Sequence, residues 1–226
     1  GTIYETFLTE SLIVENNHIA LATKKEYKYR SIVSTPVEIV KYMIKNTLNP
    51  VCNGKSPKEI KELQIADIAC GSGVFLEEAY QFLIDYCVEW YLKYKPDHLL
   101  ELSNGKKKLP LTDKRDILTN CIYGVDIDIH AVEVSKFSLL IKLTEDETPA
   151  SVRECIPILP DLSSNIKNGN SLISRDDLNA ETIAFEDLCN IRPFQWGDIN
   201  KGRNFDVIIG NPPYVKTEDI HTLESK

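Results

Sequence analysis

The apolar positions of the chain fall into short continuous runs and into stripes at helical spacing. Continuous runs at residues 65–69, 120–126 and 205–209 have the length and β-branched content of buried strands. Stripes at helical spacing follow the first two runs, over residues 74–84 and 131–143. Strands that alternate with helices predict an α/β domain with a mostly parallel sheet flanked by helices.

A further helical stripe occupies residues 37–48, and its start carries capping signals. We expect Thr35 to cap this helix and Pro36 to take its first position. Glu38 stands where a capping box places its acid.

The predicted helix over residues 37–48 belongs to the second of two parts into which we divide the chain. Apolar spacing over residues 6–22 predicts an amphipathic helix, so residues 1–30 are assigned to an N-terminal helical and connector segment. Residues 31–226 form the second domain. A parallel sheet needs strands beyond residues 205–209, so we expect the C-terminal part of this domain to lie outside the chain.

Composition narrows the class. Apolar residues make up 42% and charged residues 27% of the 226, as in soluble globular proteins. The sequence shows neither a run that could span a bilayer nor a basic and apolar leader, so we expect a cytoplasmic protein without a membrane partner. The six cysteines and four histidines lack metal-ligand spacing. The net charge of −8 argues against strong non-specific nucleic-acid binding by this part alone.

Two segments are expected to be solvated connections. The first is the lysine run at residues 106–108, which follows an Asn-Gly pair. The second is the acidic, proline-containing stretch at residues 145–160, which we predict to be a loop.

The sequence D-I-A-C-G-S-G at residues 67–73 joins a strand to a helix. Gly71 and Gly73 let the backbone approach a ligand that the helix N-terminus faces. Asp67 could accept a hydrogen bond from an ammonium group, or it could be a structural carboxylate that fixes the turn. Position 76, where a dinucleotide fingerprint needs a third glycine, holds Leu76, which disfavours a nicotinamide enzyme.

Polar residues also end the next strands. Asp126 suits the two hydroxyls of a ribose. Its alternative role is to cap the following helix, which Asp128 could do equally well. In the glycine-centred turn at residues 166–173, Asn170 or Ser171 could face the edge of a base, or the turn is an ordinary one.

The sequence N-P-P-Y at residues 211–214 follows the last strand. Its two prolines fix the backbone and remove two amide donors, which predicts a stiff loop. The carboxamide of Asn211, the carbonyl of Pro212 and the ring of Tyr214 suit a flat substrate that carries an amine. A proline turn with a packed tyrosine is the alternative.

Taken in order, these motifs resemble those of the S-adenosylmethionine-dependent adenine-N6 DNA methyltransferases, especially the methylase part of single-chain type II restriction-modification enzymes. The resemblance runs over about residues 28–215 and implies a Rossmann-like class I methyltransferase fold. The sequence departs from the family at Ser34, where an aromatic is usual, and at Asn170, where many members carry aspartate.

The resemblance implies two groups of site residues. The cofactor S-adenosylmethionine would be bound by Thr35, Pro36, Asp67, Ala69, Gly71, Gly73, Asp126, Asn170 and Ser171. Asn211 and the Pro212 carbonyl would accept hydrogen bonds from the substrate amine, and Tyr214 would stack on the target base.

The function implied is methylation of the N6 amine of an adenine flipped out of double-stranded DNA, within a restriction-modification system. The DNA-recognition region would then lie outside this chain. Two alternatives remain open at this point. One is a protein glutamine-N5 methyltransferase, since such enzymes also use an N-P-P-Y loop. The other is a non-catalytic DNA-specificity module with an inactive cofactor site.

Overall fold

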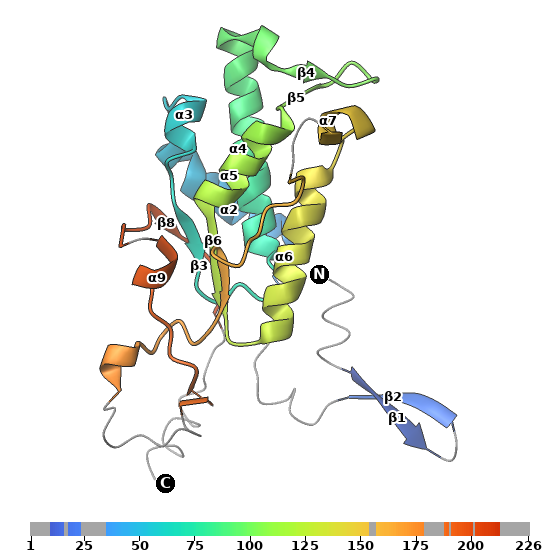
Figure 1. The fold of residues 1–226 in the computed structure, drawn as a ribbon, viewed down its shortest axis with the longest axis vertical. Helices are drawn as coiled ribbons and strands as arrows, with labels where there is room; N and C mark the ends of the chain where they lie inside the picture. The colour runs from blue at the N-terminus through green and yellow to red at the C-terminus, as the bar shows by residue number, and fades with distance from the viewer. Residues whose placement is uncertain are drawn as a thin grey trace.

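The computed structural model describes residues 10–15, 18–23, 35–153, 157–178, 188–189, 191–200 and 202–212 (Figure 1). The strands are β1 (Glu10–Glu15), β2 (His18–Thr23), β3 (Ile65–Asp67), β4 (Leu100–Glu101), β5 (Lys107–Lys108), β6 (Ile122–Asp126), β7 (Ile166–Asn168) and β8 (Val207–Ile208). The helices are α2 (Val37–Cys52), α3 (Pro57–Ile60), α4 (Val74–Tyr94), α5 (Leu111–Cys121), α6 (Ile129–Thr144), α7 (Pro149–Arg153) and α9 (Gly197–Asn200), with 3₁₀ turns at Pro96–His98 and Arg175–Asp177.

Among the described residues the central sheet has four strands in the order β7-β6-β3-β8, and every neighbouring pair is parallel. Ile65 in β3 is aligned with Ile122 in β6 on one side and with Val207 in β8 on the other. The order differs from the sequence order because helical crossovers connect the strands, as parallel pairing requires. The predicted α/β fold with a mostly parallel sheet is confirmed.

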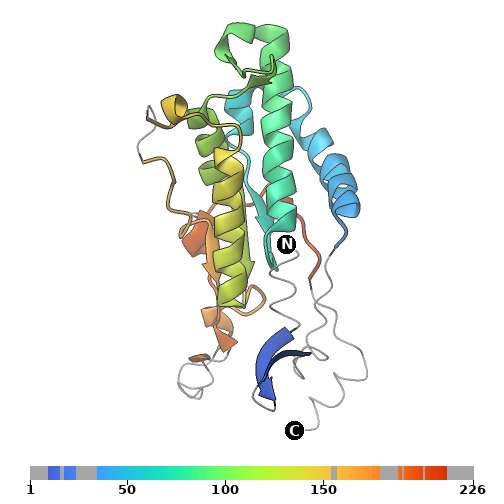
Figure 2. The same cartoon turned by 90° about the vertical axis from the view of Figure 1, so that its right-hand side faces the viewer.

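Helices α2, α4, α5 and α6 pack on one face of this sheet (Figures 1 and 2). Helix α4 lies in the middle and contacts α2 on one side and α6 on the other, and α5 packs against both α4 and α6. The apolar side of α4 is fully buried at Leu76, Ala79, Tyr80 and Leu83. Among the helices of the described residues, none is both long and apolar enough to cross a membrane.

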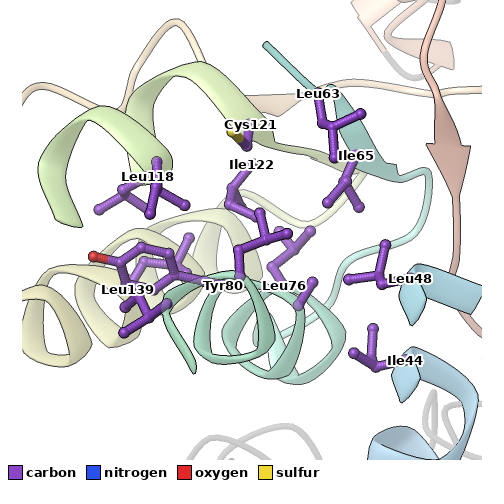
Figure 3. Packing of buried hydrophobic residues seen from close by; sticks show 14 of the residues in the cluster. Ile44, Leu48, Leu63, Ile65, Leu76, Tyr80, Leu118, Cys121, Ile122 and Leu139 are labelled. Carbon is purple, nitrogen blue, oxygen red and sulfur yellow. The ribbon is translucent and has the colours of Figure 1, made fainter. Parts of the chain in front are cut away.

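The alternation of side chains along the strands divides the interior into two clusters. Ile65 and Ile122 point to the helical layer, where Figure 3 shows them against side chains of α2, α4 and α5. Ala66 and Tyr123 point to the other face, where they join a smaller cluster. That cluster also includes Ile199 of α9, so the short helix α9 covers the second face of the sheet.

The predicted N-terminal helix over residues 6–22 is wrong for the part of it that the structure describes. Strands β1 and β2 form an antiparallel hairpin, in register from Glu10↔Thr23 to Glu15↔His18. The runs S-L-I-V and H-I-A-L-A-T are rich in residues with high β propensity, and two asparagines separate them. The apolar positions over residues 6–22 thus include residues of two paired strands and do not form one helical stripe.

Two predicted connections are also corrected. Lys107 and Lys108 form strand β5, paired with β4, and the Lys108 side chain is only 11% exposed. Helix α7 lies within the stretch predicted to be a loop. Before it, Glu147 accepts hydrogen bonds from Lys108 Nζ and Lys114 Nζ, both at 2.7 Å, with its own side chain 1% exposed. The polar residues around Lys108 indicate a solvated segment. The local sequence does not reveal its buried partner, because Glu147 is 39 positions away.

Candidate functional site

The loops that follow β3 and β8 lie side by side at one edge of the sheet. The two strands are neighbours and parallel, so their carboxyl ends meet at the same edge. The pairing continues past β8, where Ile209 N donates to Ala66 O at 2.9 Å. Gly210 then packs directly on the Asp67 side chain, because a Cβ at Gly210 would lie 2.4 Å from Asp67 Oδ1. The structure thus brings Asp67 next to the residue that precedes Asn211.

Asp67 is a buried carboxylate with one oxygen engaged and one oxygen unpaired. Oδ1 accepts a hydrogen bond from Ala69 N at 3.0 Å, which fixes the turn. Oδ2 has no partner among the described residues, and the residue is only 1% exposed. Burial raises the pKa of Asp67 to about 7; the Ala69 N–H opposes the rise, and the nearby Asp126 carboxylate adds to it. A cationic donor at Oδ2 would satisfy this group.

The glycine turn between β3 and α4 has two glycines with different tasks. Both have positive φ, +53° at Gly71 and +90° at Gly73, which other residues rarely adopt. A Cβ at Gly73 would lie 2.5 Å from Ser135 Oγ, so this glycine lets α4 pack closely on α6. A Cβ at Gly71 would meet nothing within 4 Å, so Gly71 borders open space at the edge of the sheet.

Asp126 links the loops that follow β3 and β6. Its Oδ2 accepts from Gly71 N at 2.8 Å and its Oδ1 from Asp128 N at 2.9 Å. Burial raises its pKa, although these backbone N–H groups oppose the rise. The cap of α6 is Asp128, whose side chain accepts from His130 N. The choice left open between Asp126 and Asp128 as the helix cap is therefore settled in favour of Asp128.

The turn after β7 engages both of its candidate residues in local contacts. Asn170 Oδ1 accepts from Leu172 N at 3.1 Å, and Asn170 N donates to Arg192 O at 2.7 Å. Ser171 O accepts from Trp196 Nε1 at 3.0 Å. Two of these bonds hold the turn against Arg192 and Trp196, and a role for either residue toward a base stays a prediction.

Sequence reasoning missed two residues that hold the loop after β6. Asn168 Nδ2 donates to the carbonyls of Asp126 and Ile127, at 3.0 and 2.9 Å. Arg192 Nη1 donates to the same Ile127 carbonyl at 3.0 Å. The loop that carries Asp126 is thus clamped from two directions. The only local signal was the position of Asn168 directly before Gly169, because the Arg192 contact spans 65 positions.

The predicted cap of α2 is wrong. Pro36 is the N-cap, with φ −55° and ψ 134°, and the helix has no side-chain cap. Pro36 therefore precedes the first helical residue, Val37, and its carbonyl accepts from Ile39 N and Val40 N. The hydroxyl of Thr35 is one position too early to cap the helix. Thr35 Oγ1 instead accepts a hydrogen bond from Asn211 Nδ2 at 3.1 Å, which brings two distant motifs together.

The last predicted site residues are described in part. Asn211 is half-buried and Pro212 is exposed. Tyr214 lies outside the described residues. No group of three or more potential metal ligands occurs in the part of the chain that the structure describes.

Taken together, these residues fit a ligand with a cationic nitrogen and vicinal hydroxyls. Asp67 offers an unpaired buried oxygen for the cation, and Gly71 borders open space. Asp126 is a carboxylate held rigidly beside that glycine. Asn211 directly follows Gly210, which packs on Asp67, and its side chain is hydrogen-bonded to Thr35. At this position its amide could contact a second molecule.

The contact between Gly210 and Asp67 gives a first testable prediction. In Gly210→Ala the new Cβ would clash with a buried carboxylate held by Ala69 N, so we expect a loss of about 1–3 kcal/mol in the free energy of unfolding. Urea-induced unfolding measures it. Gly197→Ala is the control, since a Cβ there meets nothing within 4 Å. Equal unfolding midpoints for the two variants would contradict the close packing.

Comparison with known proteins supports the sequence resemblance. Residues 120–226 match the family described as Eco57I restriction-modification methylase. The whole chain is 42% identical to the type II restriction enzyme and methyltransferase RM.Eco57I of Escherichia coli, of which it covers 22%. It is 27% identical over 213 residues to the adenine-specific methyltransferase PglX of Streptomyces coelicolor, with 88% of this chain and 15% of PglX covered. The chain thus spans about a fifth of the length of such relatives.

A solved structure shows the same fold. It is a nuclease-deletion mutant of the type ISP restriction-modification enzyme LlaGI in complex with a DNA substrate mimic. The TM-score is 0.51 at 16% sequence identity, with 81% of this chain and 13% of that chain covered. The expected fold and the resemblance to the methylase part of restriction-modification enzymes are confirmed.

Proposed function

We propose that this chain, whose residues 120–226 match the Eco57I restriction-modification methylase family, transfers a methyl group from S-adenosylmethionine to the N6 amine of adenine in DNA. The observation that supports the proposal is the packing of Gly210 on Asp67, which puts the residue before Asn211 beside the buried carboxyl group whose Oδ2 has no partner among the described residues. The description of the relative PglX as adenine-specific supports the choice of acceptor.

On the donor side, three residues would hold the cofactor. The unpaired Asp67 Oδ2 would accept from its ammonium group, and Asp126 from the ribose hydroxyls. Gly71 would leave room for the part of the cofactor that lies between its ammonium group and its ribose. When bound, S-adenosylmethionine supplies a methyl group on a positively charged sulfur.

On the acceptor side, Asn211 and the Pro212 carbonyl would accept hydrogen bonds from the adenine amine. The lone pair of this amine is delocalised into the ring, which makes it a poor nucleophile. Two acceptors favour a tetrahedral nitrogen and localise the lone pair toward the methyl group. As the nitrogen bonds to the methyl carbon, the bond from that carbon to sulfur would break. The methylated amine would then lose its proton to water, so a strong base is unnecessary, and the rate would come from positioning and electrostatics.

The base must leave the duplex before it can reach Asn211, which costs a few kcal/mol. Stacking on the ring of Tyr214 would recover about 1–3 kcal/mol of this. The net charge of −8 implies that other parts of the full-length protein supply most of the contacts to the phosphate backbone.

The proposal is tested with the full-length protein and radiolabelled S-adenosylmethionine. We expect label in duplex DNA, recovered as N6-methyladenine after digestion to nucleosides. Label in a glutamine-containing release-factor substrate instead of DNA would establish the alternative enzyme. Calorimetry that detects no cofactor binding would establish the inactive module.

The raised pKa of Asp67 predicts a pH dependence of cofactor binding. Below pH 7 the carboxyl holds a proton that a cation must displace, so the Kd should fall by up to about tenfold per pH unit between about pH 5.5 and 7, then level off. Because the folded protein binds this proton more tightly than the unfolded chain does, the ligand-free fold also loses stability as the pH rises from 3.8 towards about 7.

Calorimetry across this pH range measures the effect. Asp67→Asn should bind weakly and lose the slope. Asp85→Asn, a change of an exposed residue of α4, should keep it. Asp126 also has a raised pKa, so a slope that persists in Asp67→Asn would assign the titration to Asp126 and refute the role of Asp67.

A further inference from the structure

The hydrogen bond between Thr35 and Asn211 joins positions 176 residues apart. Asn211 Nδ2 donates to Thr35 Oγ1 at 3.1 Å in a partly buried contact. Helix α2 does not use this hydroxyl, because its N-cap is Pro36 and it has no side-chain cap. Thr35 therefore has a task that helix formation does not explain.

The backbone on both sides of this bond is restrained. Thr35 precedes Pro36 and Asn211 precedes Pro212, which disfavours helical backbone at both residues. The loop that carries Asn211 is also anchored by the residues before it, through the strand pairing at Ile209 and the packing of Gly210 on Asp67. With the backbone restrained, the orientation of the Asn211 carboxamide depends on its side-chain contacts, among them the bond to Thr35.

That orientation decides the chemistry that the amide presents. The terminal torsion of an asparagine side chain is broad and roughly two-fold, so the N and O ends exchange easily. With the oxygen toward a substrate amine the amide accepts a hydrogen bond. With the nitrogen there, two donors would oppose each other. A partner that takes Nδ2 selects the first orientation.

We propose that Thr35 is a positioning residue that fixes the plane of the Asn211 carboxamide for the acceptor amine. Thr35 suits this task because its β-branched side chain is stiff about χ1, so that Oγ1 is a fixed acceptor. The inference rests on the proposed function and adds to it a role for Thr35 toward the acceptor, beyond any contact with the cofactor. Loss of the hydroxyl should then slow the transfer step.

The test uses the full-length enzyme and three variants. Thr35→Val keeps the shape and removes the hydroxyl, and Thr35→Ser keeps the hydroxyl. Thr47→Val makes the same change about 15 Å further along α2, at a half-buried position. Single-turnover transfer to duplex DNA under saturating cofactor measures the chemical step, and calorimetry measures the Kd for S-adenosylmethionine.

We expect the single-turnover rate to fall by about tenfold to a hundredfold in Thr35→Val and by less than about threefold in Thr35→Ser and Thr47→Val. A fully active Thr35→Val overturns the inference alone. So does an equal loss in Thr35→Ser, or a loss confined to the cofactor Kd. A parent enzyme that transfers no methyl group to DNA overturns the proposed function and this inference together.

Discussion

Asn211→Ala should lower the rate of methyl transfer in the full-length enzyme by about 10²–10³ and leave cofactor binding intact, which is the largest effect on activity that we expect. In the proposed mechanism the substitution would remove one of two acceptors for the substrate amine at the point where positive charge develops. Loss of one preorganised polar group in an active site typically costs about 10²–10³ in rate. Asp67 and Asp126, the residues proposed to bind the cofactor, are unchanged. The Kd for S-adenosylmethionine should therefore change by less than about threefold.

The two quantities are measured separately, by single-turnover transfer of labelled methyl groups and by calorimetry. Asn46→Ala is a matched control, because Asn46 is exposed on α2 and its amide contacts only the carbonyl of Tyr42 among the described residues. Wild-type turnover in Asn211→Ala would refute the role of this amide. A parallel loss of cofactor binding would show that the loop had lost its structure.

The largest effect on stability is expected at Glu147, far from the site. Its buried carboxylate accepts from Lys108, Lys114 and Ser151. In Glu147→Ala two lysine ammonium groups would be left without their carboxylate. Breaking a buried ion pair by removing one partner typically costs about 3–5 kcal/mol, and we expect a loss of that size in the free energy of unfolding.

Urea-induced unfolding measures this loss, with Glu133→Ala as control. Glu133 pairs with Lys136 on the exposed side of α6, where an ion pair adds about 0–1 kcal/mol. Burial alone would raise the pKa of Glu147, but the hydrogen bonds from the two lysines and Ser151 outweigh it and lower the pKa. The carboxylate therefore contributes fully to the free energy of unfolding above pH 4.5, and this contribution is lost as the pH falls below that value. Equal unfolding of the two variants would show that solvent reaches Glu147.

The parts of the fold that could be predicted are those whose signal is local. Strand β6 and helices α4 and α6 were found because side-chain periodicity is a property of neighbouring residues. The neighbouring positions of the loops after β3 and β8 follow a general rule, since adjacent parallel strands place their carboxyl ends at the same edge of the sheet.

The errors concern contacts between distant positions. Thr35 carries a plausible capping sequence, yet its hydroxyl bonds to Asn211. Lys108 lies in a charged run, yet it is paired with Glu147 in the interior. The residues around Thr35 and Lys108 do not indicate that their partners are Asn211 and Glu147. The hairpin of β1 and β2 was missed for a related reason, because its pairing depends on where the chain reverses.

The crossover between β3 and β6 has a consequence for how this protein can change in length. Helix α4 carries the chain about 30 Å away from the paired motifs before the β4–β5 hairpin begins (Figure 1). The spacing of Asp67 and Asn211 is set by hydrogen bonds between adjacent strands and not by the covalent path between them. Insertions or a grafted reporter at the exposed tip around Gly105, where nothing lies within 4 Å of an added Cβ, should therefore leave the relative positions of Asp67 and Asn211 unaltered.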